Sequence, residues 1–118
     1  MSHDIVIYHN PRCSKSRETL ALLQQHGVTP RVVMYLDTPP DAAQIRQLLS
    51  QLGFSSAREL MRQKEALYRE LNLSDSTLSE TQLITALIEH PTLIERPIVI
   101  NGERARIGRP PEQVLALL

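Results

Sequence analysis

The segment IVIYHNPRCSKSR, residues 5–17, decides how the chain begins to fold. Its first four residues are β-branched or aromatic and predict a buried strand over 5–8. Asn10-Pro11 ends that strand, and helical periodicity follows from Ser14 to Gln25. Cys13, the single cysteine, is therefore expected in the turn between the first strand and the first helix.

That position predicts a reactive thiol. The first turn of a helix presents unpaired backbone N–H groups and a partial positive charge to whatever precedes it. Arg12, Lys15 and Arg17 add cations around Cys13. A free cysteine titrates near ~8.5, and both influences lower its pKa. The alternative is a small buried apolar side chain. The cationic surroundings favour a thiolate that meets an anion.

A phosphate-binding loop is a second interpretation, since Ser14 and Ser16 offer hydroxyl groups to an anion. The glycine-rich phosphate-loop pattern is absent, however. The residue six positions after Cys13 is Thr19 rather than the arginine of a cysteine phosphatase loop. Phosphate-ester chemistry is therefore disfavoured.

Composition excludes several classes of function. The chain has 118 residues, with 13 basic and 13 acidic side chains and a net charge of zero. This balance predicts neither a nucleic-acid nor a membrane partner. No secretory signal or membrane span is recognisable, so a cytoplasmic location is expected. The protein is also expected to be a monomer. A single cysteine excludes an internal disulfide and a cysteine-rich zinc site, and no metal is expected.

The rest of the chain predicts an α/β domain. A second strand over 31–36 would complete a βαβ unit with parallel strands. Helical stretches follow without an intervening strand, and Asp41 and Ser79 are candidate caps. These helices form an expected insertion at about 41–90. Their predicted ranges are 42–52, 56–63, 65–71 and 79–89.

The C-terminal part predicts two more strands and a last helix. A third strand is expected over 96–100, and Asn101-Gly102 indicates a two-residue hairpin into a strand over 104–108. A final helix over 112–118 follows Pro110-Pro111. The predicted fold is a thioredoxin-like α/β fold, a mixed four-stranded sheet with a helical insertion between the second and third strands. Residues 1–118 are expected to form a single domain.

Cys13 and Ser16 form a Cys-x-x-Ser motif. A Cys-x-x-Cys oxidoreductase resolves its own mixed disulfide with its second cysteine. Serine cannot do this, so the motif predicts that an external thiol such as glutathione resolves any adduct on Cys13.

Several motifs together resemble the glutaredoxin-coupled arsenate reductase (ArsC) family, in particular its short ArsC-like (YfgD) branch. The resemblance covers essentially the whole chain. It rests on Tyr8-His9-Asn10-Pro11-x-Cys13-x-x-Ser16-Arg17, Tyr35-Leu36, Arg96-Pro97-Ile98-Val99 and Arg109-Pro110.

The resemblance implies an active site. Cys13 corresponds to the cysteine that attacks arsenate, and Arg62, Arg96 and Arg109 to the three arginines that act with it. His9 corresponds to the histidine before the loop, and Pro97 to a cis-proline. Asn10, Ser16 and Arg17 belong to the loop motif as supporting residues. Each arginine, taken alone, is equally compatible with an ordinary solvated surface position, and His9 with a hydrogen-bonded strand end.

The resemblance also implies the chemistry. Three guanidinium groups suit a tetrahedral oxyanion and hold a thiolate. Cys13 would displace an arsenate oxygen, glutathione would attack the adduct, and glutaredoxin would supply the reduction to arsenite. No bound cofactor is implied, with glutathione acting as co-substrate. Arg12 and Lys15 stand where better-known members carry small residues, which adds positive charge beside the nucleophile.

Two other functions remain open. One is a monothiol oxidoreductase that acts on glutathione mixed disulfides or another substrate. The other is a regulatory binding protein like Spx, which shares the fold and binds RNA polymerase. Spx-type proteins use Cys-x-x-Cys as a redox switch, and Ser16 favours an enzyme.

Overall fold

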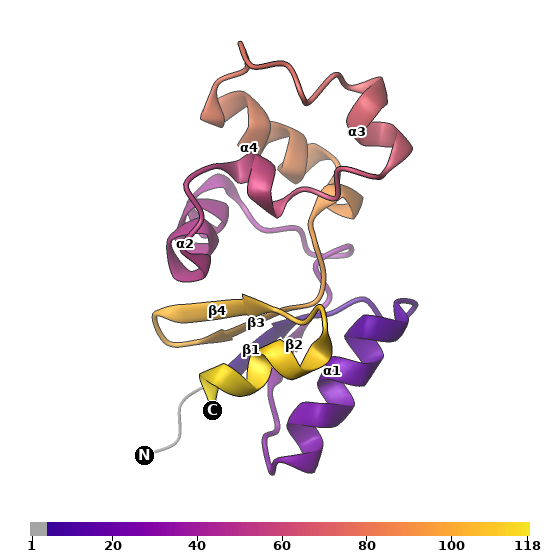
Figure 1. The fold of residues 1–118 in the computed structure, drawn as a ribbon, viewed down its shortest axis with the longest axis vertical. Helices are drawn as coiled ribbons and strands as arrows, with labels where there is room; N and C mark the ends of the chain where they lie inside the picture. Colours follow the sequence, from indigo (N-terminus) through magenta and orange to yellow (C-terminus); the bar gives the residue numbers. More distant parts are fainter. Residues whose placement is uncertain (1–4) are drawn as a thin grey trace. The chain divides into compact units, whose positions relative to one another are not determined.

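The computed structural model describes residues 5–118, which divide into two compact units (Figure 1). One unit combines residues 5–38 with Arg96–Leu118 and contains the sheet. The other, Pro39–Glu95, is built from helices. The predicted insertion at about 41–90 falls inside this second unit, and the expectation that both units form one domain stays a prediction.

The first unit contains a four-stranded mixed sheet in the order β2-β1-β3-β4. Strand β1 pairs in parallel with β2 and antiparallel with β3, which pairs antiparallel with β4. The predicted thioredoxin-like fold class is thereby confirmed. The strands are β1 (Ile5–Tyr8), β2 (Arg31–Val33), β3 (Ile98–Asn101) and β4 (Arg104–Ile107).

One face of this sheet carries the apolar core of the unit. Ile7 of β1 lies between Val32 and Val99 in the register of its two neighbouring strands. The helix α1 (Ser14–Gln25) and the 3₁₀ helix η3 (Pro111–Leu117) pack against each other and on the same cluster. Burial of this cluster fixes α1, and with it the position of Cys13. The cluster comprises Ile5, Ile7, Leu23, Val99, Val114 and Leu117.

Three strands are shorter than predicted, two of them at an identifiable break. The strand expected over 31–36 ends at Val33, because the Met34 carbonyl accepts hydrogen bonds from the Asp37 and Thr38 amides and closes a turn. The strand expected over 96–100 begins at Ile98, since Pro97 has no N–H to donate to a ladder.

The hairpin is confirmed, with its turn one residue later than predicted. Asn101 pairs with Arg104, so the two-residue loop is Gly102-Glu103. Gly102 has φ +64°, at the first loop position, where a type II′ turn takes glycine. The last strand ends at Ile107, and the final helix is 3₁₀ rather than α.

Caps define the helices of the second unit. Asp41 and Ser79 both make capping boxes, as their sequence positions predict, and Ser56 makes a third one. Two predicted stretches are shorter than expected, and one of them is a 3₁₀ turn. The elements are α2 (Ala42–Leu52), η1 (Ala57–Leu60), α3 (Ala66–Glu70), α4 (Glu80–Glu89) and η2 (Pro91–Leu93). Among residues 5–118, no helix combines the length and apolarity that a membrane crossing requires.

Candidate active site around Cys13

Cys13 is the N-cap residue of α1, with extended backbone angles and 9% of its surface exposed. Its amide donates to the Asn10 carbonyl at 3.0 Å, and its own carbonyl accepts from the Arg17 amide at 3.0 Å. The Arg12 amide donates to Asn10 Oδ1 at 3.0 Å. Asn10 therefore shapes the loop that presents the thiol, and the chain enters the helix directly after Cys13.

A buried polar pair braces this loop from within. Ser16 is fully buried, and its Oγ accepts from the Asn10 amide at 3.0 Å and lies 2.6 Å from His9 Nδ1. Burial of the ring, and then the positive charge of Arg17, lower the pKa of His9. The fold therefore favours a neutral imidazole. Because the pair joins the end of β1 to the first turn of α1, it ties the loop at both ends.

Arg17 fastens the outside of the loop. Its Nη1 donates to the Pro11 carbonyl at 2.8 Å, and the side chain is otherwise exposed. The guanidinium thus adds a hydrogen bond to the loop and positive charge to its surface.

The surroundings of the sulfur favour thiolate. Burial raises the pKa of Cys13, but the Ser16 amide, the Arg96 guanidinium and the Lys15 amide outweigh it, and the pKa lies below its ordinary value. Two of these donors are backbone N–H groups in the first turn of α1, the positive end of the helix. The third is a cation that both hydrogen-bonds to the sulfur and attracts its charge.

A second arginine approaches the same sulfur. Arg109 Nη2 lies 3.7 Å from Cys13 Sγ, and its Nε donates to the Arg96 carbonyl at 2.8 Å. The Arg96–Pro97 and Arg109–Pro110 peptide bonds are both cis. Arg96, just before β3, and Arg109, just after β4, are thus brought to Cys13 from a distant part of the chain.

Gly108 allows Arg109 to come this close. A Cβ on Gly108 would lie 2.5 Å from Thr19 Oγ1 and 2.9 Å from Pro97 Cγ, distances that real contacts do not show. The Gly108 amide donates to the Pro97 carbonyl at 2.9 Å. Sequence reasoning missed both Gly108 and the buried Thr19; the glycine immediately before the Arg-Pro motif was the available signal.

The sequence-predicted site residues fall into two groups. Cys13, Arg96 and Arg109 come together in the first unit, together with His9, Asn10, Ser16, Arg17 and Pro97. Arg62 belongs to the second unit, where it is ion-paired with Glu65 and lies 3.8 Å from Glu95. Its amide donates to the Leu93 carbonyl at 2.7 Å.

The assembled site combines a nucleophile with fixed cations. A thiolate at a helix N-terminus beside two guanidinium groups can attack a tetrahedral oxyanion while the arginines bind its oxygens. Among the described residues, no cluster of three or more His, Cys, Asp or Glu side chains could hold a metal ion. Fold and site together define a thioredoxin-like protein whose single cysteine lies at a helix N-terminus beside two arginines.

Comparison with known proteins identifies the family. The family model described as "ArsC family" matches residues 8–117, and the chain belongs to this family. YfgD of Escherichia coli K12 is 64% identical over 118 residues, covering 100% of this chain and 99% of that protein. The protein of Haemophilus influenzae named arsenate reductase is 50% identical, covering 97% and 98% of the two chains.

A solved structure of a relative shares this fold. The arsenate reductase from Vibrio cholerae superposes with a TM-score of 0.97 at 56% identity, covering 100% of both chains. The predicted family is thus confirmed, and the reductase names of these relatives support the predicted enzyme class, an oxidoreductase.

Proposed function

We propose that this protein is a glutathione- and glutaredoxin-dependent arsenate reductase that uses Cys13 as its nucleophile. The observation that carries the proposal is the position of the thiol, at the start of α1 with Arg96 and Arg109 beside it. Relatives that match nearly the whole chain at 48–50% identity are named arsenate reductase, and this favours arsenate among the possible oxyanions.

The first step forms a bond between sulfur and arsenic. The Cys13 thiolate attacks arsenate, and one arsenate oxygen leaves as water after it takes up protons. Arg96 and Arg109 bind the remaining oxygens and offset the charge that builds up during displacement. Arg62, by the family resemblance, supplies a third guanidinium.

The second and third steps use external thiols, because Cys13 is the only cysteine in the chain. Glutathione replaces another arsenic-bound oxygen, which also leaves as water. A glutaredoxin thiolate then attacks the glutathione sulfur, so the electron pair of the arsenic–sulfur bond stays on arsenic. Arsenic(V) becomes arsenic(III), a glutathione–glutaredoxin disulfide forms, and water releases arsenite from Cys13. The cycle needs only one copy of this chain and a reducing compartment that keeps glutathione and glutaredoxin as thiols.

The supporting residues have separate tasks in this proposal. Asn10, Ser16 and Arg17 hold the loop through the hydrogen bonds described above, and neutral His9 keeps Ser16 in place. Pro97 offers a carbonyl to Gly108 and so joins the two arginine-bearing segments. All five residues act by positioning the thiol and its cations.

The test is NADPH-coupled arsenate reduction with glutathione, glutathione reductase and glutaredoxin. We expect turnover that requires each component and disappears in Cys13→Ser. Turnover without glutaredoxin would contradict the proposed reduction step.

Absence of turnover would discard arsenate as the substrate. Rapid alkylation of Cys13 at neutral pH in that case, with reduction of a glutathionylated peptide, would establish the monothiol oxidoreductase instead. Stoichiometric retention by RNA polymerase would support the Spx-like regulator.

A further inference from the structure

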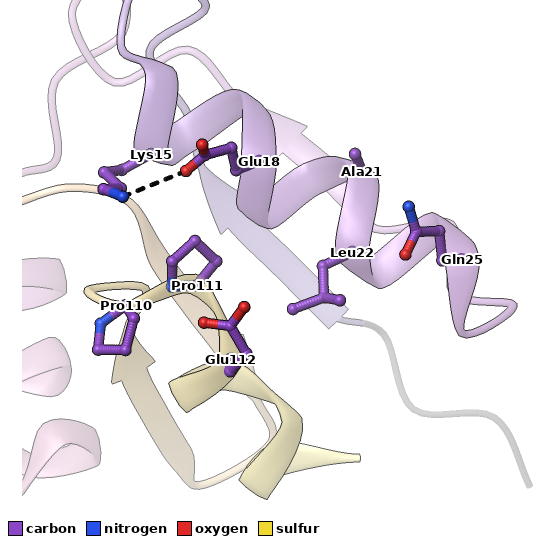
Figure 2. Close-up of a pocket in the computed structure, with 8 residues that line it drawn as sticks. All are labelled: Lys15, Glu18, Ala21, Leu22, Gln25, Pro110, Pro111 and Glu112. Atoms are coloured by element: carbon purple, nitrogen blue, oxygen red, sulfur yellow. Dashed lines mark ion pairs between the residues drawn. The ribbon is translucent and has the colours of Figure 1, made fainter.

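A groove runs between α1 and the start of η3, on the side of α1 that faces the C-terminal segment (Figure 2). Its volume is about 420 Å³. Ala21 and Leu22 of α1 line one side, and Pro110 and Pro111 line the other. Lys15, Glu18, Gln25 and Glu112 supply polar groups around this apolar lining.

The charges in the groove are mixed and accessible. Lys15 Nζ lies 3.5 Å from Glu18 Oε2, and about half of each side chain is exposed. An exposed pair of this kind holds its partners weakly. Figure 2 shows the Glu112 carboxylate on the opposite side of the groove, near Leu22. The groove therefore presents one ammonium group and two carboxylates to an occupant.

We propose that this groove binds the γ-glutamyl arm of glutathione, an assignment that rests on the proposed function. The arm ends in an α-amino acid group, which carries one carboxylate and one ammonium. Lys15 would bind the carboxylate, and Glu18 and Glu112 the ammonium. The methylene groups of the arm would lie on Pro110 and Pro111. A free oxyanion fits poorly, because two carboxylates would repel it.

Two residues that line the groove are close in sequence to residues of the candidate site. Lys15 follows Cys13 by two residues on α1, and Pro110 follows Arg109, whose Nη2 lies 3.7 Å from the sulfur. Along α1, Lys15 and Leu22 are separated by about 10 Å at the usual helical rise. An extended tripeptide is also about 10 Å long. In this proposal glutathione holds its thiol toward Cys13 while its γ-glutamyl arm lies in the groove.

Binding can be measured without any redox step. S-methylglutathione, which has no free thiol, is titrated into the Cys13→Ser protein and followed by the amide NMR signals of Ala21 and Leu22. We expect saturable shifts at these residues and about tenfold weaker binding in Glu112→Gln, the effect of losing one charge-assisted hydrogen bond. Glu70→Gln, a matched change on the exposed face of α3, should bind as the parent does.

No saturable shift at millimolar ligand would overturn the assignment, and so would equal affinity in the Glu112→Gln and parent proteins. Neither result depends on arsenate. The binding experiment therefore tests the groove assignment separately from the proposed arsenate reductase activity.

Turnover gives a second readout. Cysteinylglycine has the same thiol but lacks the γ-glutamyl arm. In the arsenate assay, Glu112→Gln should raise KM for glutathione about tenfold and leave KM for cysteinylglycine unchanged. Equal changes for both thiols would show that the substitution acts on the reaction and would overturn the groove as the γ-glutamyl site.

Discussion

Arginine serves different purposes in the two units of this protein. In the sheet-containing unit, Arg96 and Arg109 direct N–H groups at the sulfur of Cys13, and Arg109 is held by a main-chain carbonyl. In the helical unit, Arg62 faces the carboxylates of Glu65 and Glu95. A guanidinium paired with carboxylates has much of its charge offset locally. Charge that stabilises a thiolate must therefore come from the arginines that touch the sulfur.

The largest effect is expected from Arg96→Ala. Removing this cation and its hydrogen bond should raise the pKa of Cys13 and lower kcat/KM for arsenate by roughly 10- to 100-fold, as expected for a hydrogen bond between charged groups. Steady-state kinetics over a pH series measure both changes. Arg31→Ala, an exposed arginine on β2, is the control. Equal kcat/KM values and pH profiles in Arg96→Ala and Arg31→Ala would show that Arg96 has no role in the reaction.

Gly108→Ala should have the next largest effect. The added methyl group overlaps Thr19 and Pro97, so we expect a loss of about 1–3 kcal/mol in the free energy of unfolding. It should also move Arg109 away from the sulfur and raise the pH needed for Cys13 alkylation.

Gly102→Ala is a matched control. This glycine has positive φ and open space around it, so alanine there strains the hairpin and leaves the thiol unaffected. Thr19→Ala in the Gly108→Ala background removes the nearest overlap and should recover part of the stability. A Gly108→Ala protein with the parent's alkylation profile would contradict the positioning role of this glycine.

Arg62→Gln sharpens the comparison between the units. By the family resemblance we expect KM for arsenate to rise several-fold, roughly 3- to 10-fold for one weakened ionic contact. The alkylation profile of Cys13 should not change, because Arg62 is ion-paired within its own unit. A shift of that profile would show that Arg62 stabilises the thiolate. It would contradict the different roles assigned to the arginines of the two units.

The smallest effect concerns His9. Its pKa in the fold is lowered from 6.5, so between these two values the unfolded chain binds more protons than the folded one. Stability should therefore fall as pH decreases through this window. His9→Asn should flatten that decline in urea titrations, while His26→Asn, at an exposed helix end, should keep it. An identical decline in His9→Asn would show that another group causes it.

The sequence predicted the sheet because its signals are local. β-Branched runs, Asn101-Gly102 and the caps Asp41 and Ser79 each act over a few residues, and the structure contains the corresponding elements. The ends of three strands were placed wrongly, and in two of them a local break in the ladder is the reason. The Met34 carbonyl accepts two turn hydrogen bonds, and Pro97 has no N–H for the ladder.

The candidate site was predictable only in part, because contacts between segments far apart in the chain complete it. The helix N-terminus and local cations indicated Cys13 from residues 5–17 alone. Arg96 and Arg109 came from family resemblance, since nothing local separates them from surface arginines. The fit of Gly108 against Thr19 depends on two segments far apart in the chain, and periodicity carries no information about such a contact.

The central claim is that Cys13 is held as thiolate by groups of its own unit. The most direct test is the pH dependence of Cys13 alkylation in the parent, Arg96→Ala and Arg62→Gln proteins. In the parent, we predict that alkylation reaches half its maximal rate at a lower pH than for a free thiol. This pH should rise in Arg96→Ala and stay unchanged in Arg62→Gln. A parent profile like that of a free thiol, or an unchanged profile in Arg96→Ala, would contradict the account.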